Sequence, residues 1–436
     1  MTEQATQLTR NVFVLGLDEF QRGELETITA ASGLNFLQLL APEEVTRPEN
    51  GFTALLERAR AELAEFDGSV DAIIAHWDFP TSVLVPVLAA EYGMPAPSLE
   101  SVLACEHKHW SRLAQRASVP DATPDFAAFD PFDDDALDGI DLEYPFWIKP
   151  VKSHSSQLGF KVSSPDDFHE AIPQIREGIR DIGDPFNEAL AMARLPEQIT
   201  ADSGNTCLAE QIVSGQQATI EGTMFEGEFS VHGVFDSPKD ERGAHFARYE
   251  YPASLPEEIQ TRMASTSEQY LRHIGYDSGC WNVEFMWDED ADKLWLIEVN
   301  TRISQSHADL LAKVDGMSNH EAAVAVALGK RPVLPEGRGP FEVAGKLFLY
   351  TSQMADGIVR HAPSDEDIAR VAERFPETHV DIAVKPGDRL SDLADQSSYR
   401  YDIGTITAGA QSREELVAMH DEISEMLPFD IEPIEE

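Results

Sequence analysis

The amino-acid sequence predicts an α/β and α+β protein of several domains, with a doubly wound parallel sheet at the N-terminal end and a small α+β lobe at the C-terminal end. Short apolar strands alternate with helices over residues 1–100, as in doubly wound sheets. A hairpin is predicted at 281–300, and a Gly- and Pro-rich linker at 329–340 precedes a further set of predicted strands and helices. A chain of 436 residues is long enough for roughly two to four domains.

The N-terminal domain, expected over 1–100, is interpreted as Rossmann-like. Its strands are predicted at 11–16, 35–40 and 70–76, with a helix at 52–66. The glycines after the first strand do not complete a G-x-G-x-x-G pattern, so they give little support to a dinucleotide site. Open α/β sheets bind ligands beyond the carboxyl ends of their strands. The residues that follow the third strand are therefore either part of a substrate cleft or an ordinary loop: His76, Asp78 and Phe79.

The composition is strongly acidic. The chain has 33 basic and 78 acidic residues, a formal net charge of −45, and only 10 Lys against 23 Arg. With 42% hydrophobic residues it is expected to fold, with an acidic surface that suits a cytoplasm of very high salt, where charge is screened. A halophilic source is the favoured interpretation, and an acidic mesophilic protein is the alternative. No basic stripe is present, so nucleic acid is not expected as a partner.

Cysteine usage and hydropathy indicate the compartment. Cys105, Cys207 and Cys280 are unclustered, which argues against a disulfide framework and a zinc site. The first ten residues do not have the form of a secretory signal, and no apolar run approaches membrane-spanning length. A cytoplasmic protein that does not enter a membrane is expected.

The hairpin carries the most informative pattern in the chain. Strands are predicted at 281–287 and 294–300, with an acidic turn at 288–292. Because side chains alternate along a strand, one face should be polar and the other should pack in the core. The predicted polar face has Glu298, Asn300 and Arg302, and the predicted core face has Trp295, Ile297 and Val299.

This hairpin is also a candidate metal site. A turn centred near 290–291 places Glu284 within one residue of Glu298 on the facing strand. Like charges directly opposite destabilise a sheet, so the pair calls for a cation. Two carboxylates and the Asn300 oxygen suit Mg²⁺, or Mn²⁺ in its place, with water and nucleotide phosphates as further ligands. Arg302 offers a fork for an anion. The alternative is a solvated edge hairpin with scattered charges.

Glu284, followed by Glu298-x-Asn300-x-Arg302, resembles the metal-binding end of an ATP-grasp domain, the nucleotide-binding fold of biotin carboxylase, D-alanine–D-alanine ligase and the amino-acid ligases. The resemblance covers roughly 98–332 and, more loosely, the whole chain. It implies a pre-ATP-grasp domain at the N-terminal end. The further units that it implies are ATP-grasp subdomain A at 101–205, subdomain B with the metal site at 206–332, and a C-terminal lobe at 333–436 that packs against the active site.

Four of the ten lysines are concentrated near the start of subdomain A: Lys108, Lys149, Lys152 and Lys161. ATP-grasp proteins use two lysines at such places to contact ATP phosphates, which implies this role for Lys108 and Lys149. A compact ammonium on a flexible stem can follow a phosphate as it is transferred. The alternative for each is a surface lysine.

The loop at 152–160 departs from the family pattern, which is usually Gly-rich so that backbone amides can approach phosphate. Here it has a single glycine, Gly159, and three serines whose hydroxyl groups are expected to donate to phosphate instead: Ser153, Ser155 and Ser156. His154 is either a cation near the substrate or a surface histidine.

The strand at 206–213 resembles the ATP-grasp hinge. The resemblance implies that backbone groups of Gln211 and Val213, after Glu210, hold adenine. Gln217 stands where the family has an acid for the ribose, and its amide can still bond a hydroxyl. Five other residues are weak candidates for a substrate pocket or, equally, ordinary exposed or core residues: Glu221, His232, His245, Arg248 and Tyr249.

The remaining elements are predicted from periodicity and caps. A helix at 165–180 should be followed by a polar, irregular insertion at 181–205, and helices are expected at 256–274 and 318–328. The C-terminal lobe should have strands at 343–350, 379–384 and 404–408, with helices beginning at Ser364 and Ser412. No catalytic set is recognised in this lobe.

The resemblance implies an ADP-forming, Mg²⁺- and ATP-dependent carboxylate–amine ligase that works through an acyl phosphate, with Arg302 and Lys149 as catalytic residues and small-molecule substrates. A biotin-carboxylase-like enzyme is the first alternative, because Asn300-Thr301-Arg302 and His307 match that subfamily, although Ser304 and Ser306 replace its Gln and Glu. A non-catalytic ATP-binding protein is the second. A homodimer is left open, since similar proteins are often dimers.

Overall fold

The computed structural model describes residues 9–28, 33–46, 51–153, 157–238, 248–333, 335, 337–351, 356–393 and 401–434. Four sequence candidates therefore lie outside the described residues: His154, Ser155, Ser156 and His245. Within the described ranges, none of the helices combines the length and apolar character needed to cross a bilayer.

The N-terminal sheet is parallel and has the strand order β2-β1-β3, formed by Leu34–Leu39, Arg10–Leu15 and Ala72–Ala75. Both faces are covered. Phe13 and Leu15 pack in the main core, which includes residues of α3. Val12 and Val14 pack in a second cluster that includes residues of α1 and α10 (Asn319–Ala327). The predicted doubly wound parallel sheet is confirmed. Its helices are α1 (Glu19–Thr27), α2 (Pro42–Val45), α3 (Phe52–Glu65) and α4 (Thr81–Glu91).

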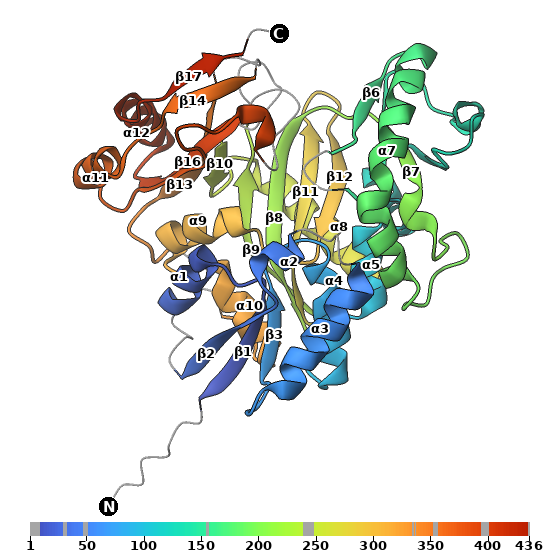
Figure 1. Ribbon diagram of the computed structural model, residues 1–436, viewed down its shortest axis with the longest axis horizontal. Coiled ribbons are helices and arrows are strands. Elements are labelled where there is room, and N and C mark those ends of the chain that lie inside the picture. The colour runs from blue at the N-terminus through green and yellow to red at the C-terminus, as the bar shows by residue number, and fades with distance from the viewer. Residues whose placement is uncertain are drawn as a thin grey trace, which may run out of the picture.

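A second sheet follows helices α5 (Leu99–Glu106) and α6 (Lys108–Ser118), which meet at His107. It is antiparallel, with β4 (Phe126–Phe129), β7 (Cys207–Gln211), β5 (Phe146–Pro150) and β6 (Phe160–Val162) in that order. The long helix α7 (Pro165–Leu190) packs against this sheet and lies at its outer side in Figure 1.

Helix α7 ends at Leu190, so the prediction of an irregular segment from 181 is wrong for the first ten of those residues. The prediction rested on the polar character of the stretch, but α7 continues through Pro185. Phe186 and Leu190 are buried in the main core. Burying two large apolar side chains contributes about 3–6 kcal/mol, which offsets the roughly 3 kcal/mol that a proline inside a helix costs.

An antiparallel eight-stranded sheet forms the centre of the molecule, in the order β12-β11-β8-β9-β10-β13-β16-β15 (Figure 1). Strand β13 pairs with β10, so the strands after the 329–340 linker continue the sheet that contains the hairpin. The hairpin therefore lies between α7 with its sheet on one side and the C-terminal strands on the other (Figure 1). The strands are β8 (Gln216–Phe225), β9 (Glu228–Asp236), β10 (Arg248–Tyr251), β11 (Gly279–Asp288), β12 (Lys293–Asn300), β13 (Val343–Tyr350), β15 (His379–Ile382) and β16 (Asp402–Ala410).

Helices and one further strand pair complete the fold. Helices α8 (Glu257–His273), α9 (Gln305–Asp315) and α10 (Asn319–Ala327) belong to the central part. The C-terminal lobe adds β14 (Gly357–His361), α11 (Asp365–Arg374), α12 (Arg413–Met426) and β17 (Asp430–Pro433), with β14 and β17 paired antiparallel. The predicted helix starts after Ser364 and Ser412 are confirmed, because each side chain accepts from an amide of the first turn.

The hairpin has the predicted register at its polar end and a bulge in its middle. Glu284 pairs with Glu298, as the turn position indicated, but Phe285 pairs with Leu296, which leaves Ile297 unpaired. A bulge changes which side chains face the core. The prediction that Trp295 and Ile297 are core residues is therefore wrong. The buried residues of this strand are Leu294, Leu296 and Val299.

Candidate active site

The two glutamates of the hairpin lie directly opposite one another, and neighbouring amides orient the predicted metal ligands. Asn300 Nδ2 donates to Asn282 Oδ1 over 3.0 Å, so the side-chain oxygen of Asn300 takes no part in this hydrogen bond. Asn282 Nδ2 donates in turn to the Arg302 carbonyl over 2.9 Å. Two strands and the start of the following loop are thereby tied together at the site.

The electrostatics of the pair favour the binding of a cation. Burial, followed by the charge of Glu298, raises the pKa of Glu284 to about 7. Burial acts on Glu298 too, but the charges of Lys108 and Lys149 outweigh it and hold the pKa of Glu298 below its usual range. Near neutral pH one carboxylate is therefore charged and its neighbour holds a proton part of the time, which is the behaviour of an uncompensated pair.

These residues fit a hard divalent cation that takes only part of its shell from protein. Among the described residues, no group of three or more His, Cys, Asp or Glu side chains is arranged to hold a metal. The predicted set is instead two carboxylates and one amide oxygen, and Mg²⁺ usually completes such a set with water and substrate phosphates.

The two predicted phosphate lysines lie near the pair. Lys108 begins α6, and its Nζ lies 3.0 Å from Glu298 Oε1 and donates to the Ser153 carbonyl over 2.8 Å. Lys149 lies on β5, and its Nζ is 2.5 Å from Glu210 Oε2. Because the lysine in each pair is only slightly exposed, these ammonium groups are held in place rather than free in solvent.

Glu210 is bound from two sides, and one of its partners, Arg112, was missed in the sequence. Arg112 Nε lies 2.6 Å from Glu210 Oε1. The same guanidinium donates to the carbonyls of Leu296 and Ile297 over 3.1 and 2.9 Å. Burial would raise the pKa of Glu210, but Arg112 and Lys149 lower it to about 2. The only signal in the sequence is the spacing of Lys108 and Arg112, which places both on one helix face.

The residues predicted to hold adenine lie at the end of β7 and directly after it. The Gln211 amide already donates to the Asp125 carbonyl over 2.8 Å, so its carbonyl and the residues up to Val213 are the groups that remain for a base. Gln217 lies on β8 next to the metal pair and donates from Nε2 to Glu284 Oε2 over 3.0 Å. Its predicted contact with a ribose stays a prediction.

Arg302 is held by a charged cluster that sequence reasoning found only in part. Its Nη2 lies 3.5 Å from Asp78 Oδ2, and the buried Lys152 Nζ lies 3.3 Å from Asp78 Oδ1 and contacts Glu106. Burial would raise the pKa of Asp78, but Lys152 and Arg302 hold it well below its usual range. Asp78 thus links the end of the N-terminal sheet to the hairpin. Lys152 and Glu106 had no predicted role.

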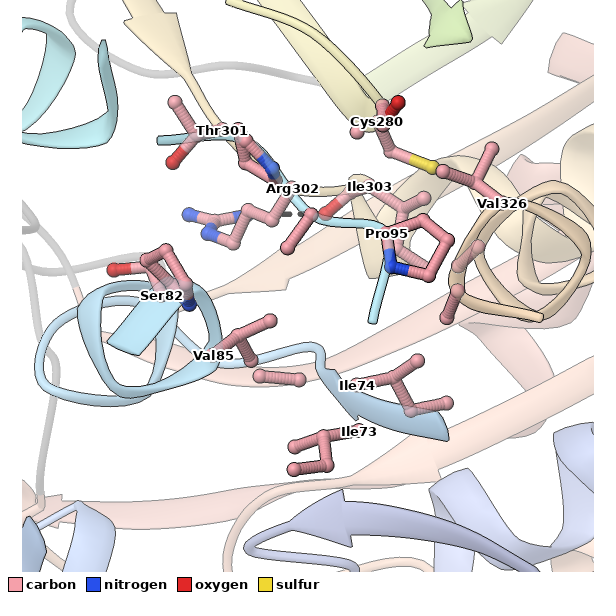
Figure 2. Close-up of a pocket in the computed structure, with 18 of the residues that line it drawn as sticks. Ile73, Ile74, Ser82, Val85, Pro95, Cys280, Thr301, Arg302, Ile303 and Val326 are labelled. Atoms are coloured by element: carbon pink, nitrogen blue, oxygen red, sulfur yellow. Dashed lines mark hydrogen bonds between the residues drawn. The ribbon is translucent and has the colours of Figure 1, made fainter. Parts of the chain in front are cut away.

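A small cavity lies behind Arg302 (Figure 2). Its walls are mainly apolar, with Ile73, Val85 and Val326 among them, and its volume is about 80 Å³. Figure 2 shows the guanidinium on the Ser82 side of this space, away from Val326. Ligand sites usually need about 300 Å³ or more, so this cavity is a packing space behind the arginine rather than a substrate site.

A larger cavity, named the reaction cavity, has a volume of about 490 Å³, and residues of α2, β10, β11, the segment after β3, the end of β12 and the start of α9 contribute to its lining. All three residues after β3 that were considered for a cleft lie in its lining: His76, Asp78 and Phe79. The lining of the reaction cavity also includes Trp77, Tyr249, Glu284, Asn300, Arg302, Gln305 and Ser306.

Of the four weak pocket candidates that the structure describes, only Tyr249 is in this lining. Glu221 is fully buried and accepts from Asn319 Nδ2 over 2.7 Å, with His307 Nδ1 at 2.8 Å. His232 contacts Thr223 Oγ1 at 3.2 Å, and Arg248 pairs with Glu250. The side chains of Glu221, His232 and Arg248 thus contact other residues of the protein and do not line the reaction cavity.

The sequence has partial matches among characterised families. The family model described as carbamoyl-phosphate synthase L chain, ATP binding domain, matches residues 250–334. The carbamoyl phosphate synthase large chain of Thermoanaerobacter sp. (strain X514) is 32% identical over 101 residues, which are 23% of this chain and 9% of that protein. The D-alanine–D-alanine ligase of Acidiphilium cryptum (strain JF-5) is 27% identical over 250 residues, which are 56% of this chain and 68% of that protein. The chain thus spans less than a tenth of the length of the synthase chain.

The structure matches along nearly its whole length. The L-amino acid ligase from Bacillus licheniformis superposes with a TM-score of 0.74 at 17% identity, covering 97% of this chain and 98% of that one. At this identity the likeness shows the fold. The ATP-grasp fold expected from the hairpin pattern is therefore confirmed.

Proposed function

We propose that this chain, which has the ATP-grasp fold, is an ADP-forming, ATP-dependent carboxylate–amine ligase that makes a carbon–nitrogen bond through an acyl phosphate. One observation carries the proposal: the opposed carboxylates Glu284 and Glu298 lie among the cations Lys108, Lys149 and Arg302. Phosphoryl transfer needs positioning and charge neutralisation more than a side-chain nucleophile. This arrangement supplies both.

ATP and Mg²⁺ are the cofactors in this proposal. Glu284, Glu298 and Asn300 would hold the metal, which when bound neutralises charge on the phosphates. Lys108 and Lys149 bind phosphate oxygens as point charges, and Glu210 keeps Lys149 in position. The backbone around Gln211 and Val213 binds adenine, and Gln217 binds the ribose. The hydroxyl groups of the serines at 153, 155 and 156 would donate hydrogen bonds to the phosphates.

Arg302 acts on the substrate that is activated. Its fork binds a carboxylate beside the γ-phosphate and then stabilises the oxyanion that forms when the amine attacks. Asp78 orients the guanidinium through its second carboxylate oxygen. The substrates are a small-molecule carboxylate and a small-molecule amine.

Bicarbonate is disfavoured as the activated acid. Ser306 lies in the reaction cavity at the position where the biotin-carboxylase pattern has an acid. A serine hydroxyl cannot accept the bicarbonate proton as a carboxylate does, because the hydroxyl is a far weaker base. The ligase reading is therefore preferred over the carboxylase reading.

A product-resolved screen tests the proposal. Pairs of carboxylates and amines are incubated with Mg²⁺ and ATP in high salt, and nucleotide products are separated. We expect a pair that yields ADP, phosphate and an amide, with Arg302→Lys strongly impaired because a lysine cannot form the two-point contact. AMP and pyrophosphate as products, or turnover that depends on bicarbonate alone, would overturn the assignment.

A further inference from the structure

A second cavity of about 600 Å³ adjoins the reaction cavity, and Trp77, Gln305 and Ser306 line both. It lies between α1, α9 and the strands of the C-terminal lobe, which are neighbours in Figure 1. The two cavities therefore share a wall, and a molecule in the second cavity would lie next to the first. This inference rests on the proposed function, because it concerns the amine of that reaction.

The charges in the second cavity favour a cationic ligand. Glu24, Asp309 and Asp381 are in the lining, and the two lysines there are Lys313 and Lys346. Lys313 is already engaged, with its Nζ 3.4 Å from Asp309 and in contact with the Glu377 carbonyl. Burial, followed by the charge of Asp309, raises the pKa of Glu24, so negative charge is only partly compensated here.

Lys346 stands where the two cavities join. It lies on β13 directly across from Tyr249 on β10, and cross-strand partners share one face of a sheet. Tyr249 lines the reaction cavity, and Lys346 lines the second cavity. The Lys346 Nζ lies 3.5 Å from Ser306 Oγ, a residue of both linings. Among the described residues, no ion pair is formed at this nitrogen within 4.0 Å.

The surroundings of Lys346 make its ammonium easier to deprotonate than an exposed lysine. Burial lowers its pKa, and the charges of Asp381, Asp402 and Asp309 offset this only in part. These three acids come from β15, β16 and α9, the elements around the lysine. Arg302 and Glu284 lie toward the opposite end of the same sheet face, and their charges affect the pKa of the Tyr249 hydroxyl group. A lysine that gives up its proton readily can serve as a base.

We propose that the second cavity admits the amine substrate as an ammonium ion and that Lys346 takes the proton that frees its lone pair. The step balances as follows. R–NH₃⁺ transfers one proton to neutral Lys346 Nζ. The nitrogen lone pair then forms the C–N bond to the acyl carbon, while the C–O bond to phosphate breaks and its electron pair leaves with phosphate. The second nitrogen proton leaves with the phosphate, which departs as HPO₄²⁻.

Hydroxylamine separates this inference from the proposed function, because it is largely uncharged at pH 7 and attacks an acyl phosphate without a base. Lys346→Met and Lys346→Arg are compared with the wild type using the carboxylate found in the screen, with either its amine or hydroxylamine. Lys330→Met, on the exposed Lys330 after α10, is the matched control. Amide and hydroxamate are measured at pH 7.

We expect both Lys346 variants to form amide about 10²–10⁴-fold more slowly, the usual contribution of general base catalysis, while hydroxamate formation stays within about twofold of wild type. Amide formation by Lys346→Met should rise about tenfold per pH unit between about pH 7 and 9, as the free amine fraction grows. Wild-type amide rates in both variants would overturn the proposal, as would equal loss of amide and hydroxamate. Failure of the wild type to form hydroxamate with any carboxylate would instead refute the proposed function.

Discussion

Glu284→Gln should make the metal-free protein more stable at alkaline pH, although it removes a predicted metal ligand. The amide keeps an oxygen that can accept from Gln217 Nε2, so the packing change is small. Burial and Glu298 raise the pKa of Glu284 from 4.5 to about 7. The folded state therefore binds a proton that the unfolded state has lost between these two values, and stability falls as pH rises through that window.

The size of the effect follows from the same values. A carboxyl group with a folded pKa of about 7 and an unfolded pKa of 4.5 costs about 3 kcal/mol once both states are ionised, with each pKa unit worth about 1.36 kcal/mol. The free energy of unfolding of Glu284→Gln should match that of the wild type near pH 4.5 and exceed it by up to about 3 kcal/mol near pH 8.

Urea unfolding in EDTA and constant high salt, at half-unit pH steps, measures this difference. Glu289→Gln, in the exposed turn of the same hairpin, is the control and should follow the wild type at every pH. Adding Mg²⁺ and ATP should stabilise the wild type more than Glu284→Gln at pH 8, because the metal replaces the proton. Parallel pH curves for wild type and Glu284→Gln without metal would refute the reasoning about the carboxylate pair.

Three further predictions follow from the charges. Glu298→Gln should raise the Mg²⁺ concentration needed for half-maximal ADP release by at least about tenfold, because even the loss of a group that only supports a metal ligand costs about 10–100-fold. Full turnover at limiting Mg²⁺ would show that the hairpin is only a sheet edge. Glu106→Gln should lower the free energy of unfolding by about 3–5 kcal/mol, because it removes a partner of the buried Lys152 ammonium, and a loss below about 1 kcal/mol in a urea titration would mean that Asp78 alone satisfies this lysine. With a formal charge of −45, the protein should melt at a higher temperature in about 2 M KCl than in dilute buffer, because salt screens its self-repulsion, and equal melting temperatures would contradict this explanation of the acidic surface.

The parts of the fold that depend on local pattern were predictable from the sequence. Period-two alternation and an acidic turn were enough to pair Glu284 with Glu298. Alternating strands and helices were enough for the N-terminal parallel sheet. In both cases the decisive contacts lie within short stretches of sequence or repeat at regular intervals.

The bulge at Ile297 shows why the rest was not predictable. Arg112 donates to the carbonyls of Leu296 and Ile297, and it lies 184 and 185 positions away in the chain. A local alternation pattern cannot reveal such a partner. Local pattern also cannot reveal the partners of Lys152, because Asp78 and Glu106 lie on other elements. Nor can it reveal that α7 continues past Pro185, because burial of Phe186 in the main core stabilises this part of the helix.

The site shows the same division. The motif residues Glu284, Glu298, Asn300 and Arg302 were recognisable as a set because they share one hairpin. Lys346 was not, because the C-terminal lobe has no motif of its own. Lys346 lies beside Tyr249 only because β13 pairs with β10, and these two strands are far apart in the sequence.

An isotope transfer measurement tests the acyl phosphate directly. When the carboxylate substrate is labelled with ¹⁸O in both oxygens, one of them attacks the γ-phosphate and stays with phosphorus after the amine displaces it. The account predicts that each turnover releases phosphate with a single ¹⁸O atom, seen as a mass increase of about 2 Da, and an amide with one labelled oxygen. Unlabelled phosphate accompanied by ADP would contradict the central claim, because the carboxylate would then never have been phosphorylated.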